Sequence, residues 1–473
     1  MKAGIAVQPK FEGKKMIFGK FRELYFVGIG GAGMSGIAEI LSNLGYKVSG
    51  SDISPSEITE YLERLGIKIY GEHKRGNIGT ANVVVISSAV GNDNPEVIEA
   101  REKGIPVIKR AEMLGELMRL KYSIGIAGTH GKTTTTSMIG KIFIEAKLDP
   151  TVIVGGIVAG TGSGAALGAG EYLVAEADEY DKSFLSMFPS MAVVTNIEAD
   201  HLDCYDGMED LKNSFLAYMN RVPFYGTVVY GADNPILQKL QGRISRASVS
   251  FGLTSRADYQ AVDIKYREGG SEFSVFGRGE MVGRIILNVP GEHNVLNAMA
   301  ATAAALELEI PFGVIAEALS KFRTVGRRFE IKGVVNDIMV VDDYAHHPTE
   351  VAVTLRTARE SYKRRVIAVF QPHLFSRTRQ FFKEFADVLH QADVAYLADI
   401  YPAREKPMPG VTSEMILNYA KEKGYRNIHY IGPKENAIEA VIKIAQPGDI
   451  IITIGAGSIT RINPEILKGI EKR

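Results

Sequence analysis

The sequence predicts an α/β protein with three domains, each built around a mostly parallel sheet. Apolar strand-like runs alternate with helical patterns from residue 24 to 110, and a second series begins at SIGIAG (123–128). A third alternating series follows from about residue 326. Strands that alternate with helices indicate parallel sheets with helical crossovers. The length of 473 residues also agrees with about three domains of ordinary size.

The first predicted domain is a doubly wound, Rossmann-like unit. Its apolar runs read as strands in the segments LYFVGIG, YKVSGSD, NVVVISSAV and PVIKR. The runs between them read as helices in the segments SGIAEILSNLG, EITEYLERLGI and NPEVIEAREKG. Parallel strands joined in this way collect ligands at their carboxyl ends, so we expect a binding site after the first strand.

The second domain contains the expected strands SIGIAG, YLVAEAD (172–178) and MAVVTNI (191–197), each of which ends in polar residues. Residues 227–290 predict additional β-structure, and GEHNVLNAMAATAAALEL (291–308) predicts a long helix. The third domain, also Rossmann-like, has the strands DIMVVDD, VIAVF, VAYLAD and DIIITIG. We expect the domains to span residues 1–120, 121–325 and 326–473.

Composition and charge exclude several classes of function. Lysine plus arginine equals aspartate plus glutamate, at 55 each, so no bulk positive field attracts nucleic acid or an anionic membrane. No apolar run reaches the length of a membrane span, and the first residues lack a signal-peptide core. The only cysteine, Cys204, excludes an internal disulfide. We expect a cytoplasmic protein in which Cys204 is structural.

The first glycine loop follows the first expected strand. Gly28, Gly30 and Gly33 fit the pattern G-x-G-x-x-G, and Asp52 ends the next strand. The glycines would let the backbone approach a diphosphate at a helix N-terminus, and the aspartate would accept hydrogen bonds from a ribose or a base. NAD and a UDP group both meet these requirements. Glycines used only for packing the helix against the strand remain a third interpretation.

The second glycine loop reads GIAGTHGKTTTT (125–136). It supplies G-x-x-G-K-T, although Ile126 stands where the Walker pattern has its first glycine. A strand, a turn and a helix N-terminus with Lys132 and Thr133 are the parts that hold β- and γ-phosphates and place a hydroxyl on magnesium. The alternative is a turn that serves packing alone.

Further motifs resemble those of the Mur ligase family, the ATP-dependent amino-acid ligases of peptidoglycan precursor synthesis. They run in the family's order across nearly the whole chain: GIGGAGMSGIAEIL, ISSAV, GTHGKTT, VAEADEYDKSF, TNIEADHLD, GEHNVLNA, VGRRFE, DDYAHHPTE, FQPHLFSRTR and DIYPAREKP. The resemblance implies a UDP-sugar-binding domain, an ATP-binding domain and an amino-acid-binding domain, in a monomer or weak homodimer. One phosphate loop would hold the UDP group and the other the ATP.

The resemblance implies that L-alanine is joined to the lactyl carboxylate of UDP-N-acetylmuramate. A carboxylate is a poor electrophile, so the γ-phosphoryl of ATP would activate it as an acyl phosphate, which the amine of L-alanine then attacks. Charge gathers on phosphoryl oxygens, so lysine, arginine and Mg²⁺ should carry the catalysis. A family member that attaches a recycled tripeptide to the same sugar is the alternative, but the form GGAGMSGIA favours alanine.

The resemblance assigns the ATP site to loop residues and to residues of later motifs: Gly128, Thr129, His130, Gly131, Lys132, Thr133, Thr134, Asn294, Asn297, Arg327 and Asp343. The two asparagines would read the adenine, although Asn294 could instead cap its helix. Asp343 would hold the ribose and Arg327 would reach the γ-phosphate.

The resemblance assigns the metal site to Thr133, Glu176 and His201. Together with Lys132 and Arg327, the last two are the expected catalytic residues. His201 is an unusual ligand for Mg²⁺, which prefers oxygen, so a hydrogen-bonding residue at a strand end is the alternative. The neighbouring acids Asp178, Glu179 and Asp181 could form a solvated loop face. Lys212 lies about a turn too early for the carbamylated lysine of some Mur ligases, so we expect none.

Two further sets of residues would bind the other substrates. The UDP-sugar set consists of Gly30, Gly31, Ala32, Gly33, Asp52, His73, Ser87 and Ser88. The set around the amino acid consists of Tyr344, His346, His373 and Arg377, where a guanidinium suits the α-carboxylate. His73 could equally be a solvated histidine, and Arg328 and Arg379 could be surface residues.

Other classes of function leave part of the pattern unexplained. An NAD-dependent dehydrogenase would use only the first loop. A simple NTPase or kinase would leave the first loop and the third domain without a role. A non-catalytic UDP-sugar sensor would not need the metal ligands.

Overall fold

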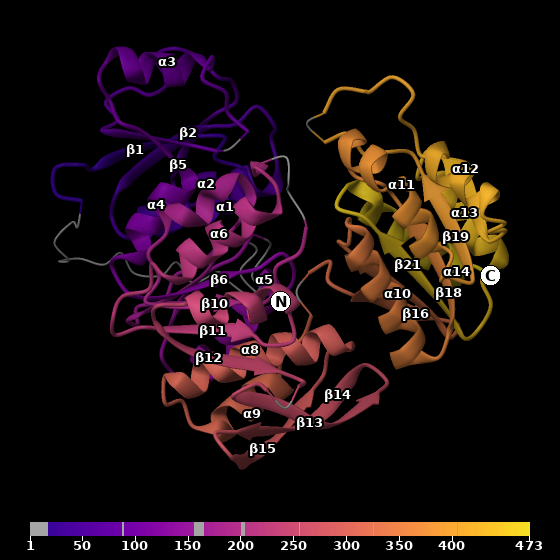
Figure 1. Cartoon of the computed structure of the whole chain (residues 1–473). Coiled ribbons are helices and arrows are strands. Elements are labelled where there is room, and N and C mark those ends of the chain that lie inside the picture. Colours follow the sequence, from indigo (N-terminus) through magenta and orange to yellow (C-terminus); the bar gives the residue numbers. More distant parts are fainter. Residues whose placement is uncertain are drawn as a thin grey trace, which may run out of the picture. The chain divides into compact units, whose positions relative to one another are not determined.

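The computed structural model describes residues 18–87, 89–155, 165–199, 204–254, 256–324, 326–403 and 405–473. The chain forms three α/β domains, each around its own sheet (Figure 1). The first sheet and the strands of the second sheet up to residue 252 belong to one compact unit, and the third sheet belongs to another. In the described ranges, no helix has the length and apolar character needed to cross a membrane.

The first sheet has five parallel strands in the order β3-β2-β1-β4-β5. Its strands are β1 (Glu23–Val27), β2 (Lys47–Ser51), β3 (Lys68–Tyr70), β4 (Val83–Ile86) and β5 (Val107–Lys109). Its helices are α1 (Ala32–Asn43), α2 (Glu57–Arg64), α3 (Pro95–Glu102) and α4 (Arg110–Met118). The strand order reverses between β1 and β4, and the first glycine loop follows β1 at this position, where α/β sheets bind ligands.

Alternate residues of β1 pack on opposite faces of the first sheet. Leu24 and Phe26 join a core that contains residues of α1, α2 and α4, whereas Tyr25 and Val27 join the smaller core with α3. All four side chains are almost fully buried. The near-continuous apolar sequence of this strand is therefore the pattern of a central parallel strand that is covered on both faces.

The second sheet has ten strands in the order β15-β14-β13-β12-β11-β10-β6-β9-β7-β8. Its strands are β6 (Tyr122–Ala127), β7 (Thr151–Ile153), β8 (Ala165–Ala166), β9 (Tyr172–Glu176), β10 (Met191–Val194), β11 (Thr227–Gly231), β12 (Ala247–Gly252), β13 (Tyr259–Arg267), β14 (Gly270–Gly277) and β15 (Glu280–Leu287). Its helices are α5 (Lys132–Glu145), α6 (Met208–Met219), α7 (Pro235–Leu240), α8 (Glu292–Glu307) and α9 (Phe312–Ser320). The β-structure predicted for residues 227–290 and the long helix that follows are both present.

The centre of the second sheet determines where its functional residues lie. Strand β6 is flanked by β10 and β9, and all three are parallel. Their carboxyl ends therefore lie at one edge, where β6 leads into the second glycine loop and β9 ends at Glu176. Segments that lie far apart in the sequence meet at this edge.

The third sheet has six strands in the order β16-β17-β21-β18-β19-β20, and only the edge strand β16 is antiparallel to its neighbour. Its strands are β16 (Glu330–Val335), β17 (Ile338–Asp343), β18 (Arg365–Phe370), β19 (Val394–Ala398), β20 (Ile428–Gly432) and β21 (Asp449–Ile454). Its helices are α10 (Pro348–Tyr362), α11 (Phe375–Leu389), α12 (Glu414–Glu422), α13 (Asn436–Ile444) and α14 (Asn463–Glu471).

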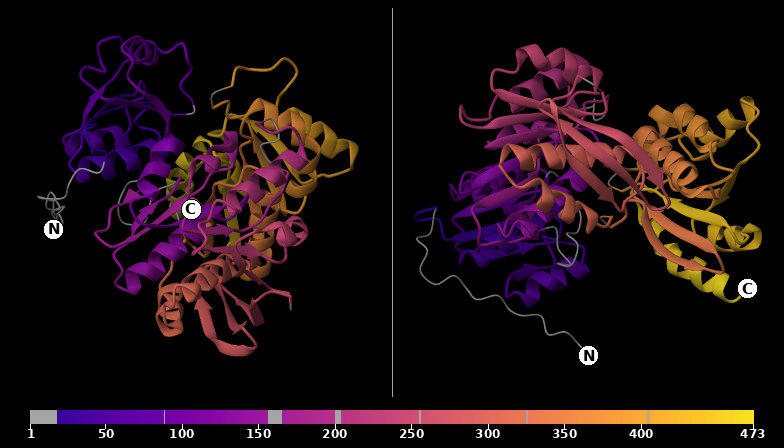
Figure 2. Two further views of the ribbon diagram at one scale, coloured as in Figure 1. Left: turned by 60° about the vertical axis from the view of Figure 1, so that its left-hand side comes forward. Right: turned by 90° about the horizontal axis from the view of Figure 1, so that it is seen from below.

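Two separate apolar cores sandwich the third sheet. One core joins the sheet to α10, α11 and α12, and the other joins it to α13 and α14. In Figures 1 and 2 these helices are the orange and yellow ribbons on either side of the sheet. The predicted Rossmann-like architecture is thus present here, with an added antiparallel edge strand.

Candidate functional site

The second glycine loop opens directly into α5. Gly131 is the N-cap of that helix and has a φ of 85°, a left-handed conformation that favours glycine. A Cβ atom at this position would lie 2.3 Å from Oδ1 of Asn297, so only glycine fits the loop here. The first backbone N–H groups of α5 have no partner within the helix, which makes this end suitable for phosphate.

Two residues after β10 hold the loop in shape. The backbone N–H of His130 donates to Oδ1 of Asn196 at 2.9 Å. The carbonyl of His130 accepts from Thr195 Oγ1 at 2.6 Å and from Asn196 Nδ2 at 3.0 Å. The loop is therefore fixed before any ligand binds. Neither residue is among the predicted site residues, although both lie in the motif TNIEADHLD.

Asn297 lies against this loop, as the resemblance implies. Its Oδ1 accepts a hydrogen bond from Thr135 of α5 at 3.3 Å. Asn294 donates through Nδ2 to the carbonyl of Pro290 at 2.6 Å, in the first turn of α8. This bond is not the N-capping alternative, in which the side-chain oxygen accepts from a backbone N–H, and Asn294 is the third residue of α8. Whether either asparagine reads adenine stays a prediction.

Lys132 forms a buried ion pair with Glu179. Its Nζ lies 2.8 Å from Oε2 and 3.0 Å from Oε1 of that carboxylate, and it also donates to the carbonyl of Gly128 at 2.6 Å. Burial alone would lower the pKa of Lys132, but Glu179 and Asp178 outweigh it and raise that pKa. Lys132 is therefore charged and aimed at the loop.

The solvated-face interpretation of the acidic segment is wrong for Glu179, which is 1% exposed. Asp181 differs from Glu179, because its side chain is 49% exposed and its carboxylate pairs with Nζ of Lys109 at 2.7 Å. The sequence alone does not indicate which of these acids turns inward.

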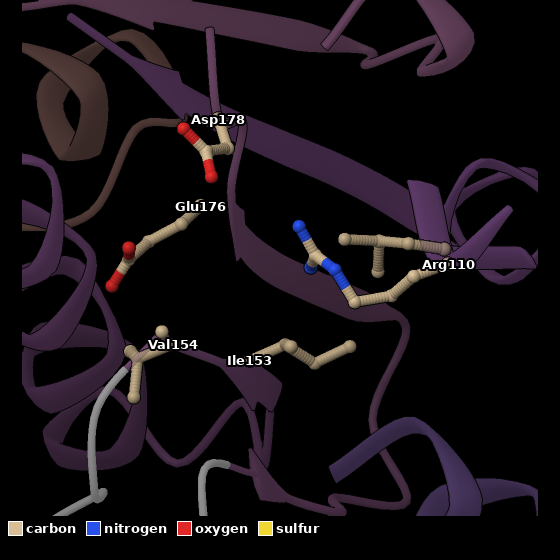
Figure 3. A pocket seen from close by; sticks show the side chains of 7 residues that line it. Arg110, Ile153, Val154, Glu176 and Asp178 are labelled. Atoms are coloured by element: carbon tan, nitrogen blue, oxygen red, sulfur yellow. The ribbon is translucent and has the colours of Figure 1, made fainter. Parts of the chain in front are cut away.

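A pocket lies between the end of β9 and the start of α4. Its polar lining consists of Arg110, Glu176 and Asp178, and Leu114, Ile153 and Val154 supply an apolar wall. In Figure 3 the guanidinium of Arg110 points into the space that the two carboxylates border. Carboxylate oxygens here and the hydroxyl of Thr133 at the start of α5 are the hard donors that Mg²⁺ prefers.

The expected metal site is only partly described. His201 lies outside the described residues, so its role stays a prediction. Among the residues that are described, no group of three His, Cys, Asp or Glu side chains is arranged to hold a metal ion. The donor set of Glu176 and Thr133 fits Mg²⁺ by its chemistry, and the remaining ligands would come from phosphate oxygens and water.

The first glycine loop is braced by Asp52. The backbone N–H of Gly30 donates to Oδ2 of Asp52 at 2.8 Å, and the N–H of Ser54 donates to Oδ1 at 3.0 Å. Gly31 is the N-cap of α1, and Ser87 faces the loop from the end of β4. The predicted residues Gly30, Gly33, Asp52 and Ser87 therefore meet at one edge. Ser88 is not among the described residues, and the structure does not describe the side chain of Ala32.

His73 is held by a buried carboxylate rather than by solvent. Its Nδ1 lies 3.1 Å from Oε2 of Glu96 and 3.0 Å from Oγ of Ser51. Glu96 is fully buried and also accepts from Tyr25 and Asn77, both at 2.8 Å. The interpretation of His73 as a solvated histidine is wrong. Glu96 fixes one ring nitrogen and leaves Nε2 for a ligand, and sequence reasoning missed it because it lies on α3.

The third domain brings its four predicted amino-acid-binding residues together. The rings of Tyr344 and His346 lie 5.4 Å apart, and those of His346 and His373 lie 5.9 Å apart. Nη1 of Arg377 lies 3.5 Å from Nδ1 of His373. Burial and the nearby Arg377 lower the pKa of His346, although Glu350 opposes them. A neutral histidine beside an arginine suits the binding of a carboxylate.

Arg327 and Asp343 flank this cluster. Nε of Arg327 lies 3.0 Å from Oδ2 of Asp342, and Nη2 donates to the carbonyl of Gly455 at 2.5 Å. Arg328 is half-buried 5.3 Å from the ring of Tyr344, so it is not merely a surface residue, whereas Arg379 is exposed. The roles of Arg327 and Asp343 toward ATP stay predictions.

Asp343 is a buried carboxylate with two backbone partners. Its oxygens accept from the N–H groups of Phe329 and Ala345, both at 2.8 Å. Burial raises the pKa of Asp343 to about 6, although Arg328 and the two backbone donors oppose the shift. The folded state therefore binds a proton here more tightly than the unfolded chain does.

This shift predicts a pH-dependent stability difference between the wild type and an Asp343→Asn variant. The stabilising contribution of the proton is complete below the ordinary pKa of 3.8 and is lost as the pH rises through about 6. Asparagine resembles the protonated carboxyl and does not titrate. The free energy of unfolding of the wild type should therefore fall by about 3 kcal/mol relative to the variant across this window. Urea unfolding of both proteins at several pH values measures it.

The comparison with a variant is needed because His293 also makes the stability depend on pH. Burial, with Arg328 and Arg356, lowers the pKa of His293 to about 4. This shift makes the free energy of unfolding increase as the pH rises, which is opposite to the effect of Asp343. His293 is present in both proteins, so its contribution cancels in the difference. Parallel curves for the two proteins would contradict the raised pKa of Asp343.

Two residues outside the site have local roles. Nζ of Lys212 lies 2.6 Å from Oε1 of Glu209 on the same helix. This ion pair does not test whether Lys212 is carbamylated, so the absence of a carbamate stays a prediction. Cys204 is half-buried and packs against the large apolar core, as a structural residue would.

These features define an α/β fold with two glycine loops at helix N-termini, and the chain belongs to the Mur ligase family. Three models of that family match in succession: the Mur ligase family catalytic domain at residues 23–122, the Mur ligase middle domain at 126–305, and the Mur ligase glutamate ligase domain at 327–457. Members of this family use ATP as a co-substrate.

The similarity to individual proteins extends over the whole chain. A UDP-N-acetylmuramate–L-alanine ligase of Geotalea uraniireducens is 49% identical over 452 residues, with 96% of this chain and 99% of the relative covered. The same enzyme of a Geobacter species is 50% identical, with 95% and 98% covered. The crystal structure of UDP-N-acetylmuramate-alanine ligase from Thermotoga maritima superposes with a TM-score of 0.81 at 29% identity, with 95% and 99% covered.

A murein peptide ligase is less similar in structure. The crystal structure of a murein peptide ligase from Psychrobacter arcticus gives a TM-score of 0.69 at 26% identity, with 96% of this chain and 99% of that chain covered. The comparison therefore favours the alanine ligases.

Proposed function

We propose that this protein joins L-alanine to the lactyl carboxylate of UDP-N-acetylmuramate, with conversion of ATP to ADP and phosphate, in peptidoglycan precursor synthesis. The observation that carries the proposal is the pair of glycine-capped helix N-termini in one compact unit of a chain that is 49% identical to such an enzyme. One reaction that consumes a UDP sugar and ATP needs two such sites.

The first step would transfer the γ-phosphoryl group of ATP to the lactyl carboxylate. Lys132 and the N–H groups of α5 would hold the β- and γ-phosphates and stabilise the charge that develops there. Thr133, Glu176 and His201 would hold Mg²⁺, which supplies a Lewis acid for the phosphoryl oxygens when bound. The resulting acyl phosphate is an electrophile, unlike the carboxylate.

The second step would be attack by the amine of L-alanine on the acyl phosphate, with phosphate as the leaving group. Arg377 and His373, which lie 3.5 Å apart, would bind the α-carboxylate beside Tyr344 and His346. Arg327 would approach the γ-phosphate, Asp343 the ribose, and Asn294 and Asn297 the adenine. These assignments rest on motif positions and on the residue clusters described above.

The UDP sugar would bind at the first sheet. The N–H groups after Gly30 would hold the diphosphate, and His73 and Asp52 would face the uridine. His73 supports this role because Glu96 orients its ring and leaves Nε2 available. Ser87 and Ser88 would lie at the sugar phosphate.

We further propose the domain limits 1–120, 121–325 and 326–473, a cytoplasmic location, no nucleic-acid partner, and a monomer or weak homodimer. The three sheets and the three successive family models support the limits. The balance of 55 basic and 55 acidic residues supports the absence of a nucleic-acid partner.

Phosphate release from ATP tests the function directly. We expect release only when UDP-N-acetylmuramate and an amino acid are both present, with L-alanine preferred. Burial of one methyl group is worth about 1–3 kcal/mol, so glycine should be used roughly tenfold to a few hundredfold less well. Use of the tripeptide in place of L-alanine would instead identify a murein peptide ligase. Turnover of NADH without ATP hydrolysis would overturn the proposal.

A further inference from the structure

We propose that Arg110 binds the lactyl carboxylate of the UDP sugar and positions it for phosphoryl transfer. The inference rests on the proposed function and adds a residue that the motifs do not include. Arg110 lies at the start of α4, next to the pocket that Glu176 and Asp178 border (Figure 3).

The position of Arg110 connects the two phosphate sites. A Cβ atom added at Gly33 would lie 2.9 Å from Nη1 of Arg110, so the guanidinium lies directly against the first glycine loop. The same side chain lines the pocket with Glu176, at the end of β9. A sugar nucleotide that extends from the first loop toward the second would therefore pass Arg110.

Arg110 is a cation for which the described part of the chain supplies no hydrogen-bonding or ion-pair partner. Within the described ranges, its half-buried side chain makes no hydrogen bond or ion pair, whereas the adjacent Lys109 pairs with Asp181 at 2.7 Å. Arg110 is also the first residue of α4, where the helix dipole disfavours a positive charge. The fold thus gains no evident stability from this charge.

The charge of the pocket indicates the ligand. Glu176 and Asp178 repel an anionic substrate, so a cation of the protein favours the binding of a carboxylate near them, in addition to the Mg²⁺ that Glu176 would hold. A guanidinium supplies two parallel N–H donors for a carboxylate and stays protonated, which leaves the substrate carboxylate ionised as a nucleophile. Ile153 and Val154 provide an apolar wall that suits the methyl of a lactyl group.

The diphosphate of the same substrate is a second anion that could reach Arg110. Two UDP sugars distinguish them, because UDP-N-acetylglucosamine has the diphosphate but lacks the lactyl group. Calorimetric titration of each sugar into the wild type, Arg110→Ala, Arg110→Lys and Lys109→Ala measures the contribution of the carboxylate. Lys109→Ala is the matched control, because it removes one positive charge from the adjacent position.

We expect Arg110→Ala to weaken binding of UDP-N-acetylmuramate by about 30-fold or more and to leave binding of UDP-N-acetylglucosamine nearly unchanged. Arg110→Lys should recover part of the loss, since lysine keeps the charge but not the two-pronged geometry. Lys109→Ala should bind both sugars like the wild type. The thermal unfolding midpoint of Arg110→Ala should equal or exceed that of the wild type.

Three results would overturn the inference. Equal losses for both sugars would assign Arg110 to the diphosphate, an unchanged affinity for UDP-N-acetylmuramate would remove it from the site, and a lowered unfolding midpoint with equal losses would give it a structural role. Each of these requires a wild type that releases phosphate with L-alanine. A wild type that neither binds UDP-N-acetylmuramate nor turns over would count against the proposed function instead.

Discussion

Lys132→Ala should abolish ligation while binding of the UDP sugar stays nearly intact. The lysine charge would stabilise the transferring phosphoryl group, and loss of such a charge typically costs about a thousandfold or more in rate. The first glycine loop belongs to a different sheet, so calorimetry with UDP-N-acetylmuramate should give an unchanged affinity. Phosphate release in the presence of both substrates measures the turnover.

The same substitution should also lower stability, because it leaves Glu179 buried without its cation. Removal of one partner of a buried pair typically costs about 3–5 kcal/mol. The double variant Lys132→Met, Glu179→Gln removes both charges, so it should recover stability without recovering turnover. Recovery of turnover in the double variant would show that the loss had come from misfolding. A loss of sugar affinity in properly folded Lys132→Ala would contradict the assignment of the two loops.

Glu176→Gln should lower turnover by about a hundredfold or more at limiting magnesium, since a bound metal supplies several kcal/mol of charge stabilisation. Glutamine keeps the size of the side chain but removes its charge. The unfolding midpoint should change little, because the relief of like-charge repulsion from Asp178 offsets the lost attraction between Glu176 and Lys132. Initial rates over a series of magnesium concentrations provide the measurement.

Asp181→Asn is the matched control for this experiment. It removes a negative charge from the same acidic segment, but its carboxylate is 49% exposed and paired with Lys109. The control should show the magnesium dependence of the wild type. If Glu176→Gln did so too, Glu176 would not be a metal ligand.

The sequence predicted those parts of the fold that depend on local pattern. The alternation of apolar runs and helices predicted the parallel sheets, and the glycines predicted both loops, because a turn of this kind leaves few alternatives. The four residues Tyr344, His346, His373 and Arg377 meet as the resemblance implies. They lie on motifs about thirty residues apart that only a parallel sheet brings together.

The parts that escaped prediction depend on tertiary proximity. Nothing in the segment ADEYD distinguishes Glu179 from its neighbours. Its inward direction arises in a tight turn in which Asp181 and Lys182 have left-handed backbone conformations. Glu96 lies in the first turn of a helix, where acidic residues are common, yet it is the fully buried acceptor that orients His73. Such pairings become visible only when the sheet places the ends of different strands side by side.

The ion pair between Lys132 and Glu179 also affects which anions this loop accepts. The Glu179 carboxylate lies 2.8 Å from the ammonium group of Lys132. An incoming phosphate therefore has to compete with this carboxylate for the lysine. A small free phosphate gains little besides that one interaction. A nucleotide would also gain contacts through its base, its ribose and its remaining phosphates. Its free energy of binding would therefore stay favourable although it displaces the carboxylate from Lys132. If this loop binds ATP as proposed, the ion pair would disfavour free inorganic phosphate there and would favour release of that product of the reaction.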